Sequence, residues 1–511
     1  MVKWVITIAT SALPRRPLTC MKRVRSGFLP PISLEAPGSP LHRQIYEWLR
    51  RAISDGRLRP RQAIPSTRAL ASDLGVSRIP VLTAYEELRA EGYLETFVGA
   101  GTRVAAAIPD NPVELGNGSL RGPVGRSAPR TVSRGVRALL AMPQDPPIRM
   151  TGAFRVSSPA LDRSPNAIWS LLVRRHARNP SADQMAYGDP MGHEPFRAAI
   201  ASYLGAARAV RCDASQIMVT AGSQQGLQIC ARTLLDPGDG VWIEEPGYPG
   251  AQRAFAFAGG ELVPVPVDNR GLNVEEGIRR APQARAAYIT PSHQYPMGMA
   301  MDAARRLQLL AWSTRSGGWI IEDDYDSEYR FARRPIASLQ GLDRDERVIY
   351  VGTFSKVLFP ALRLGYLVIP QDLVPAFRAT RDAADIFPPR LFQAALTDFM
   401  AEGHFARHIA RMRMLYQERC ATLVDAINAR LGATLRIVNA DAGMHLVGLL
   451  APGVDDRLVA RRAAAVGLST IPLSNCCLET PPRRGLILGY GSSSPEQIRA
   501  GVARLADILA G

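Results

Sequence analysis

The chain has 511 residues, of which 46% are hydrophobic and 21% are charged. This composition indicates a globular protein with more than one domain, and it excludes a disordered, collagen-like, coiled-coil or membrane-spanning chain. The formal net charge is +16, and residues 1–150 hold 22 Lys and Arg against 11 Asp and Glu. Residues 1–150 are thus strongly basic, while the rest of the chain, the body, is near neutral. This asymmetry predicts that residues 1–150 bind a polyanion, and it favours a nucleic acid over a membrane surface.

Residues 1–38 are predicted to be a disordered tail. Residues 3–13 faintly resemble a signal peptide, but no small-residue cleavage site follows them. We interpret residues 1–20 as a non-functional extension, with translation able to start at Met21. The six cysteines form no CxxC pair and no metal-ligand spacing, which predicts reduced thiols in a cytoplasmic protein with no metal site.

Residues 39–106 have the pattern of a small helical module. Apolar residues at helical spacing predict a helix over residues 41–53. A short helix is predicted over residues 68–74, and a third begins at Ser77, a residue type that caps helices. A glycine separates these last two helices, and this arrangement predicts a helix-turn-helix. Strand-like alternation on both sides of a Gly-Ala-Gly turn then predicts a hairpin.

Three stretches of this module resemble the winged helix-turn-helix of GntR-type regulators: LHRQIYEWLRRAISDGRLRP, IPSTRALASDLGVSR and AYEELRAEGYLETFVGAGTRV. The resemblance implies that the second helix of the motif enters the major groove of DNA while the hairpin, or wing, touches the adjacent backbone or minor groove. A single Arg here could be an ordinary solvated charge, but the ordered set favours double-stranded DNA as the partner. The residues assigned to DNA contact are Arg68, Ser77, Arg78 and Gly99.

Two positions depart from the GntR pattern. Ile79-Pro80 stands where a polar pair is usual, and Arg61 stands where a glycine is usual. Proline is sterically allowed in the first turn of a helix, but it removes an N–H that could bind a phosphate. We therefore expect DNA binding with altered details of base readout.

Residues 107–150 are rich in Pro, Gly, Ala, Ser and Arg and are predicted to be a basic linker. From 151 to 511 apolar runs alternate with amphipathic stretches. This alternation predicts an α/β fold with a mostly parallel sheet, its large lobe spanning about 185–370, followed by a smaller α+β lobe over about 371–511. The short buried strands are predicted at 241–243, 287–289, 319–321 and 348–351.

Lys356 is the only lysine of this body, because 59 of the 62 basic residues are Arg and the other two lysines lie in the tail. Among these side chains only Lys can lose its proton and act as an amine nucleophile. The stretch GTFSKVLFPALRLG (352–365) also supplies two hydroxyls and a guanidinium. An amine that condenses with a carbonyl, beside groups that hold a phosphate, predicts pyridoxal 5′-phosphate, although one lysine can also survive by chance.

Three further segments suit the same cofactor. AGSQQG (221–226) lies between a strand and a helix, where backbone N–H groups bind anions. Tyr248 follows another strand and can stack on a flat ring. EDDYD (322–326) ends a third strand, and a carboxylate there can keep a pyridine nitrogen protonated. Taken singly, each segment has an ordinary explanation as a capped turn, a packing aromatic or a solvated loop.

In this order the segments resemble fold-type I, class I aminotransferases, and residues 40–511 as a whole resemble MocR-type bacterial regulators. The resemblance implies that Lys356 forms the Schiff base and that Asp323, or else Asp324, pairs with the pyridine nitrogen. Tyr325 would bond the phenolic oxygen and Tyr248 would stack on the ring. The phosphate would be held by Ser223, Gln224, Thr353, Ser355 and Arg363. For the carboxylate of an effector the candidate is Arg484, with Arg483 close behind.

The main hypothesis is a DNA-binding regulator that senses pyridoxal phosphate, an amino compound, or both. By resemblance it is a head-to-tail homodimer in the bacterial cytoplasm, on the nucleoid when bound to DNA. The alternative is a bifunctional or genuine aminotransferase that carries a DNA-binding domain. The stretch Tyr295-Pro296-Met297-Gly298 stands where aminotransferases have Asn-Pro-Thr-Gly, which favours regulation with at most half-transamination. A third possibility is that the cofactor is only a structural prop.

Overall fold

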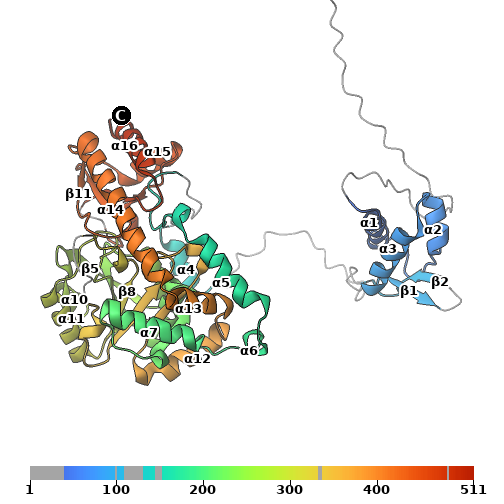
Figure 1. The fold of residues 1–511 in the computed structure, drawn as a ribbon, viewed down its shortest axis with the longest axis horizontal. Coiled ribbons are helices and arrows are strands. Elements are labelled where there is room, and N and C mark those ends of the chain that lie inside the picture. The colour runs from blue at the N-terminus through green and yellow to red at the C-terminus, as the bar shows by residue number, and fades with distance from the viewer. Residues whose placement is uncertain are drawn as a thin grey trace, which may run out of the picture. The chain divides into compact units, whose positions relative to one another are not determined.

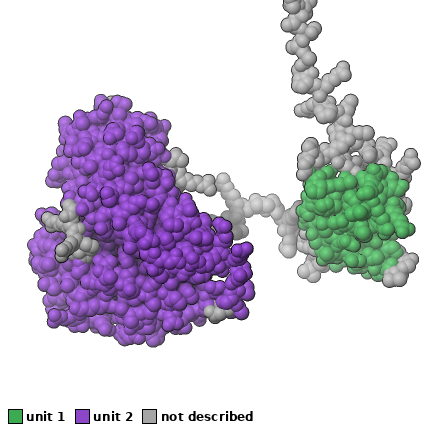
Figure 2. Space-filling model, viewed as in Figure 1, with its two compact units in different colours: residues 1–130 green, residues 131–511 purple. Residues whose placement is uncertain are grey.

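The computed structural model describes residues 39–97, 101–108, 131–143, 152–331, 337–479 and 483–510. The chain divides into two compact units, residues 1–130 and 131–511 (Figure 2). The predicted tail, most of the predicted linker and Gly99 lie outside the described residues. No described helix is both long enough and apolar enough to cross a membrane.

Within its described residues, the first unit has three helices and a two-stranded antiparallel hairpin (Figure 1). Its elements are α1 (Leu41–Ser54), α2 (Thr67–Leu74), α3 (Arg78–Ala90), β1 (Leu94–Phe97) and β2 (Gly101–Val104). Ile45, Leu49 and Ile53 form one stripe along α1 and are almost completely buried, as their helical spacing predicted. Burial of this stripe against α2 and α3 is what holds the short helices together.

Three positions of the first unit refine the sequence predictions. Ser66 caps α2, its Oγ accepting a hydrogen bond from the Ala69 N–H at 3.2 Å. Ser77 does occupy the N-cap position of α3, but its hydroxyl makes no capping hydrogen bond there. Arg61, at the position where glycine is usual, has a backbone φ of +65°, in the left-handed region that glycine favours.

The second unit is built on an eight-stranded sheet in the order β3-β10-β9-β8-β7-β4-β5-β6. Strands β5, β4, β7, β8 and β9 run parallel, while β10 and β6 are antiparallel to their neighbours. The strands are β3 (Ile217–Thr220), β4 (Gly240–Glu245), β5 (Glu261–Asp268), β6 (Gly271–Leu272), β7 (Ala286–Ile289), β8 (Trp319–Asp324), β9 (Val348–Thr353) and β10 (Gly365–Val368). The four predicted strands are thus confirmed, with bounds extended by one to three residues.

Helices cover both faces of this sheet, so its strands are buried on both sides. One face packs on α8, α9 and α12, and the other packs on α7 and α13 towards β3 and on α10 and α11 towards β6. The helices up to the small lobe are α4 (Arg134–Ala141), α5 (Asn166–Arg178), α6 (Ala182–Met185), α7 (Glu194–Arg208), α8 (Ser223–Leu234), α9 (Pro249–Ala258), α10 (Val274–Arg280), α11 (Ala303–Ser316), α12 (Val374–Asp385) and α13 (Leu391–Ala401).

Helix α4 lies inside the segment that was predicted to be linker. It packs against α9, and a Cβ added at Gly135 would lie 2.4 Å from the Phe257 carbonyl oxygen. Residues 131–143 therefore belong to the second unit rather than to a linker. The helix was missed because its apolar stripe spans only two turns within a Pro- and Gly-rich stretch.

The small lobe packs a four-stranded antiparallel sheet, in the order β11-β12-β14-β13, against long helices. Its elements are α14 (His404–Leu431), β11 (Leu435–Ile437), β12 (His445–Leu450), α15 (Asp456–Ala465), β13 (Ile471–Pro472), β14 (Gly485–Gly489) and α16 (Pro495–Ala510). Figure 1 shows α14 running from the region of α13 up to the small-lobe sheet. The α/β body and the α+β lobe both agree with the predicted fold class.

Candidate functional site

The carboxyl ends of the parallel strands meet at one edge of the large sheet. In open α/β sheets this edge is where ligands bind. A cavity of about 520 Å³ opens there, and all nine residues that the resemblance assigned to the cofactor line it. They are Ser223, Gln224, Tyr248, Asp323, Tyr325, Thr353, Ser355, Lys356 and Arg363. The tertiary structure thus brings together side chains that are up to 140 positions apart in the chain.

Lys356 lies in the turn that follows β9, and its side chain is partly buried. Its Nζ donates a hydrogen bond to the Ser157 carbonyl oxygen at 3.1 Å. Burial lowers the pKa of the Lys356 ammonium to about 8, against the opposing pull of the Asp326 and Asp323 carboxylates. The amine is therefore poised to act as a nucleophile near neutral pH.

Asp323 and Asp324 are adjacent on β8 and therefore point to opposite faces of the sheet. Asp323 faces the cavity, where its Oδ2 accepts a hydrogen bond from the Tyr288 hydroxyl at 2.8 Å. Its buried Oδ1 has no hydrogen-bond partner in the part of the chain that the structure describes. Burial raises the pKa of Asp323 to about 7. An unsatisfied, buried carboxylate oxygen is costly unless a ligand completes it.

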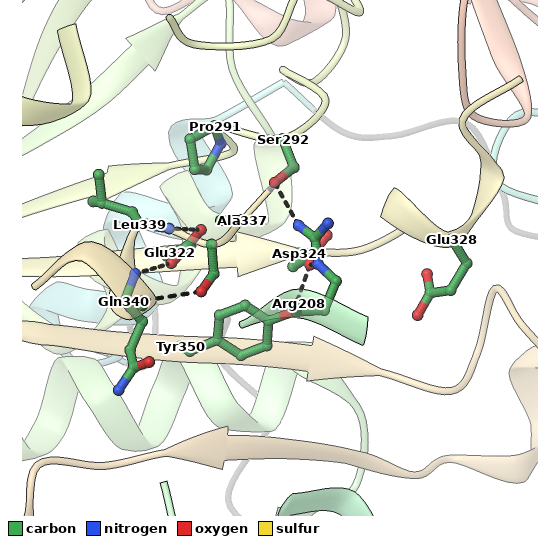
Figure 3. Close-up of polar contacts among 12 residues, drawn as sticks. Arg208, Pro291, Ser292, Glu322, Asp324, Glu328, Ala337, Leu339, Gln340 and Tyr350 are labelled. Carbon is green, nitrogen blue, oxygen red and sulfur yellow. Dashed lines mark hydrogen bonds and ion pairs between the residues drawn. The ribbon is translucent and has the colours of Figure 1, made fainter. Parts of the chain in front are cut away.

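Asp324 belongs instead to a polar network on the other face (Figure 3). Its Oδ2 accepts from Arg208 Nε at 2.8 Å and from the Tyr350 hydroxyl, and both charged side chains are 3% exposed. Arg208 also donates to Ser292 Oγ at 2.7 Å. Glu322, two residues earlier, shares this face and accepts backbone N–H groups at 2.8 Å. The acids of the network brace β8 without reaching the cavity.

An anion cradle forms another part of the cavity wall. Helix α8 begins at Ser223, and helix N-termini present N–H groups and a positive dipole to anions. Gly222 has a φ of +87°, and a Cβ there would lie 3.1 Å from Arg363 Nη1, so a larger residue would crowd the guanidinium. Arg363 also donates to the Ala221 carbonyl oxygen. The hydroxyls of Thr353 and Ser355 complete the cradle from the β9 side.

Aromatic rings line the same cavity. Tyr248 is the N-cap residue of α9, and its ring meets that of Tyr295 edge to face, with centroids 5.5 Å apart. Tyr295 stands where aminotransferases have Asn, and it too lines the cavity. The Tyr325 hydroxyl lies 2.9 Å from His293 Nδ1.

These groups fit pyridoxal 5′-phosphate. The cofactor needs an amine for its aldehyde, a carboxylate for its ring nitrogen and an anion site for its phosphate. Lys356, the unpartnered Asp323 oxygen and the cradle at α8 supply them around one cavity. Of these three groups, the Asp323 oxygen indicates a ligand most specifically. Buried polar atoms normally have a hydrogen-bond partner, and the protein itself supplies none to this oxygen among the described residues.

The position of Arg484 differs from its prediction as an effector-binding residue. Arg484 is exposed at the start of β14 and forms an ion pair with Asp455 at 3.1 Å, and it does not line the cavity. Arg483 lines a separate cavity. The sequence placed both near a strand end but could not show that this end lies away from the site.

Other cavity residues were not anticipated from the sequence. Arg155 lines the cavity from the segment before α5, and its Nε donates to Ser492 Oγ at 3.3 Å. Ser157, Tyr288 and Thr290 also line it. Tyr288 lies in a predicted strand, but strand periodicity does not tell which face carries a site. Nothing in the sequence around Arg155 signals a binding role.

In the first unit the three described DNA-contact candidates are all exposed. Arg68 lies in the first turn of α2, while Ser77 and Arg78 lie at the start of α3. Arg78 Nε donates to Thr67 Oγ1 at 3.2 Å, so the starts of α2 and α3 are adjacent. Ile79 is 73% exposed beside them. Two exposed guanidinium groups at adjacent helix starts suit a surface that binds a polyanion.

Two family models match the chain. Residues 41–104 match "Bacterial regulatory proteins, gntR family", and residues 170–485 match "Aminotransferase class I and II". The first match coincides with the helices and hairpin of the first unit. The second covers the large sheet, most of the cavity lining and most of the small lobe.

Two curated regulators are similar to this chain over nearly their whole length. The "Probable rhizopine catabolism regulatory protein MocR" of Rhizobium meliloti is 44% identical, over 91% of this chain and 93% of that protein. The "HTH-type pyridoxine biosynthesis transcriptional regulator PdxR" of Corynebacterium glutamicum is 32% identical, over 91% and 95%.

Among solved structures, the second unit is similar to LysN, an α-aminoadipate aminotransferase from Thermus thermophilus. The match has a TM-score of 0.66 and 27% identity, and it covers 74% of this chain and 95% of that one. That structure is described as complexed with N-(5′-phosphopyridoxyl)-L-leucine.

Proposed function

Because the chain belongs to the GntR family of bacterial regulatory proteins, in the MocR-type form that joins this module to a class I and II aminotransferase domain, we propose that it senses pyridoxal phosphate, an amino compound, or both. The protein is a pyridoxal-phosphate-dependent transcriptional regulator. The observation that carries the sensing proposal is the single cavity in which an amine of lowered pKa, an orphaned carboxylate oxygen and an anion cradle converge.

Each side chain of the cavity has a defined task in this proposal. The bound cofactor supplies an electrophilic aldehyde on an electron-withdrawing ring. Lys356 holds the aldehyde carbon, and Asp323 holds the ring nitrogen and its proton. Tyr248 covers one ring face, and Tyr325 donates to the ring oxygen. The phosphate is held by Ser223, Gln224, Thr353, Ser355 and Arg363.

Arg155 replaces Arg484 as the residue that holds an acidic group of the effector. It lines the same cavity as Lys356, and the structure gives its guanidinium one hydrogen bond, from Nε to Ser492. Its planar fork can therefore grip a carboxylate or another oxyanion while the effector's amine lies towards Lys356.

The effector acts on DNA binding through its differential affinity for two arrangements of the protein, since a ligand with equal affinity for both shifts nothing. We place this switch in a head-to-tail homodimer. In this dimer the two heads, which are the first units of the two protomers, bind two half-sites of a promoter. The protein would act in the bacterial cytoplasm, on the nucleoid when DNA is bound.

The test compares wild type with Lys356→Ala and Lys356→Arg. Purified wild type mixed with pyridoxal phosphate should turn yellow and keep the cofactor covalently after borohydride reduction, and neither variant should do so. Lys356→Arg keeps the positive charge, so it separates covalent capture from simple attraction of the phosphate. A borohydride-stable adduct in the Lys356→Ala variant would overturn the proposal.

The regulatory half of the proposal needs a second measurement. Binding to the DNA upstream of the protein's own gene is measured by gel shift, with and without cofactor, for wild type and Lys356→Ala. We expect the cofactor to change the affinity of wild type alone. Rapid multiple turnover of amino acids and keto acids, with no cofactor effect on any promoter, would instead establish an aminotransferase with an attached DNA-binding domain. Cofactor-independent binding and transcription would leave the cofactor as a structural prop.

A further inference from the structure

Beside the cavity, three side chains form a short chain of hydrogen-bonding groups. The Tyr325 hydroxyl lies 2.9 Å from His293 Nδ1, and the same ring nitrogen lies 2.9 Å from Asp326 Oδ1. Tyr325 lines the cavity, whereas only 4% of the His293 side chain and 1% of the Asp326 side chain are exposed. One buried imidazole nitrogen thus faces two oxygens.

Nδ1 cannot accept a hydrogen bond from both the Tyr325 hydroxyl and the Asp326 carboxylate, because the carboxylate has no hydrogen to donate. A ring nitrogen of histidine carries either a hydrogen or a lone pair, and an ionised carboxylate can only accept. A lone pair on Nδ1 would face the lone pairs of the Asp326 carboxylate in a low-dielectric site, which is unfavourable. A hydrogen on Nδ1 donates to Asp326, and Nδ1 then cannot accept from Tyr325. The hydroxyl proton of Tyr325 must turn away from His293.

The surroundings keep this pair fixed. The bond from His293 is the hydrogen bond that the structure gives to the Asp326 carboxylate, whose buried Oδ2 has no partner among the described residues. A Cβ added at Gly443, where φ is +82°, would lie 2.3 Å from His293 Cε1 and 2.7 Å from Asp326 Oδ2. The small-lobe backbone therefore closes directly over the pair, and only glycine permits that approach.

We propose that Asp326 and His293 form a tautomer lock: Asp326 holds the proton of the imidazole on Nδ1, and the locked ring directs the Tyr325 hydroxyl as a donor into the cavity. His293 and Asp326 are positioning residues that act through Tyr325. Without Asp326, neutral His293 can carry its proton on Nε2, and the Tyr325 hydroxyl then donates to Nδ1 instead. The lock secures one donor for the cofactor's ring oxygen where Tyr295 stands in place of an Asn.

A neighbouring histidine provides an internal control. His445, from β12, has its ring centroid 5.6 Å from that of His293, and its Nε2 lies 3.2 Å from the Pro296 carbonyl oxygen. A carbonyl only accepts, so His445 carries its proton on Nε2. Burial lowers the pKa of His445 to about 4, which keeps it neutral at pH 7. Two adjacent histidines are thus expected in opposite tautomers.

The first test is ¹⁵N NMR of the full chain labelled at histidine, which has seven such residues. The chemical shifts of the two ring nitrogens distinguish the tautomers. We expect Nδ1–H for His293 and Nε2–H for His445 in wild type, and a gain of Nε2–H for His293 in Asp326→Asn. His293→Gln assigns the signals, and Tyr325→Phe assigns them independently if that variant does not fold. An Nε2–H tautomer for His293 in wild type would overturn the lock.

The second test is a double-mutant cycle on bound cofactor, and this arm rests on the proposed function. A donor to the ring oxygen withdraws charge from it, which weakens that oxygen's hold on a proton at the Lys356 nitrogen. Tyr325→Phe should therefore raise the pH midpoint of the cofactor's colour change, by about one unit. In the Asp326→Asn background the same substitution should raise it by less than half as much, because the donor has already turned away.

The cycle is needed because Asp326→Asn also removes a negative charge near Lys356, which shifts the midpoint in the opposite direction. That effect is present in both backgrounds and cancels in the difference. The other titratable groups near Tyr325, namely Lys356, Tyr295, Asp323 and Glu244, are unchanged in both. Equal shifts in the two backgrounds would overturn the lock. A wild type that never becomes coloured would count against cofactor binding instead, and the NMR result would still decide the lock.

Discussion

The two units expose their functional side chains to opposite environments. In the first unit Arg68, Ser77 and Arg78 lie within eleven residues of sequence, and all three are exposed. In the second unit Asp323 is buried, Lys356 is partly buried, and they follow different strands of a large sheet. The head thus presents charged side chains that are exposed to water. The second unit instead holds its charged side chains in a cavity, where burial changes their properties. The same types of charged group should therefore respond differently to salt, substitution and pH.

Salt should produce the largest difference between the units. Binding of DNA by exposed arginines releases counterions, so the affinity should fall about a thousandfold between 50 and 200 mM salt if two heads bind six or more phosphates. Arg78→Ala should weaken binding and reduce the slope of log affinity against log salt by about one for each phosphate that is no longer neutralised. Fluorescence anisotropy with labelled DNA measures both.

Cofactor binding is the control for this prediction. Over the same salt range, the affinity for pyridoxal phosphate should change less than tenfold, because its ligands are enclosed and partly buried. If DNA affinity were flat across this range, the head would not be an electrostatic surface.

Exchanging the two adjacent acids of β8 should separate binding from stability. Asp323→Asn should weaken cofactor affinity about 10–100-fold, since it removes the charge that pairs with the ring nitrogen. Asp324→Asn should leave the affinity of the folded protein close to that of wild type. It should instead lower the free energy of unfolding of the second unit by about 3–5 kcal/mol, because Arg208 stays buried without its partner.

Absorbance titration and denaturant unfolding, applied to both variants, check this pair. The variants are isosteric and one residue apart, so each controls for the other. Weaker cofactor binding by folded Asp324→Asn, with Asp323→Asn unaffected, would assign the ring nitrogen to the other acid and contradict the geometry in Figure 3.

The pH dependence of cofactor capture should show how burial affects Lys356. Only the neutral amine attacks an aldehyde, and the pKa of Lys356 is lowered to about 8. The rate at which cofactor-free protein captures the aldehyde should therefore fall about tenfold for each pH unit below 8 and level off above it. Stopped-flow absorbance between pH 6 and 10 measures it.

A free lysine side chain serves as reference for this measurement. Its amine has a pKa of about 10.4, so its reaction with the same aldehyde should go on accelerating beyond pH 9. Parallel curves for the protein and the free amine would show that burial does not tune Lys356.

The smallest effect is expected in the backbone of the head. Arg61 has a φ of +65° while its N–H donates to the Val104 carbonyl oxygen at 2.9 Å. Arg61→Gly should stabilise the first unit by about 0.5–1 kcal/mol, the relief of left-handed strain less the greater chain entropy of glycine. Differential scanning calorimetry of the full chain should show the head transition a few degrees higher. Arg59→Gly removes the same charge without relieving strain, and it should lower that transition.

Local pattern was sufficient for much of the fold. The four strands predicted in the large lobe lie within β4, β7, β8 and β9, and the stripe of α1 is buried as predicted. These features depend on residues that are close together in the sequence, so the local pattern is enough to predict them. Helix α4 was missed because its stability comes from packing on α9, more than a hundred residues later.

The candidate site was predictable only where its residues lie in motifs. Lys356, Thr353 and Ser355 fall in one stretch, and the family resemblance assigned the other roles. Arg155 could not be found in this way, because its segment reaches the cavity only by pairing with β14, through a bridge between Phe154 and Gly489. The prediction for Arg484 failed for a related reason. The sequence indicates that a strand begins there, but not where that end of the strand lies relative to the cavity.

The sequence by itself determined which chemical groups exist and in what order: one lysine in the body, a pair of adjacent acids, a basic head with a recognisable module. Only the tertiary structure decided that Asp323 rather than Asp324 faces the cavity, and that His293 stands between Tyr325 and Asp326. Side chains of a strand alternate between two faces, and here helices bury both faces, so hydrophobicity cannot mark the face that holds the site. That choice is made by the long-range packing of the sheet.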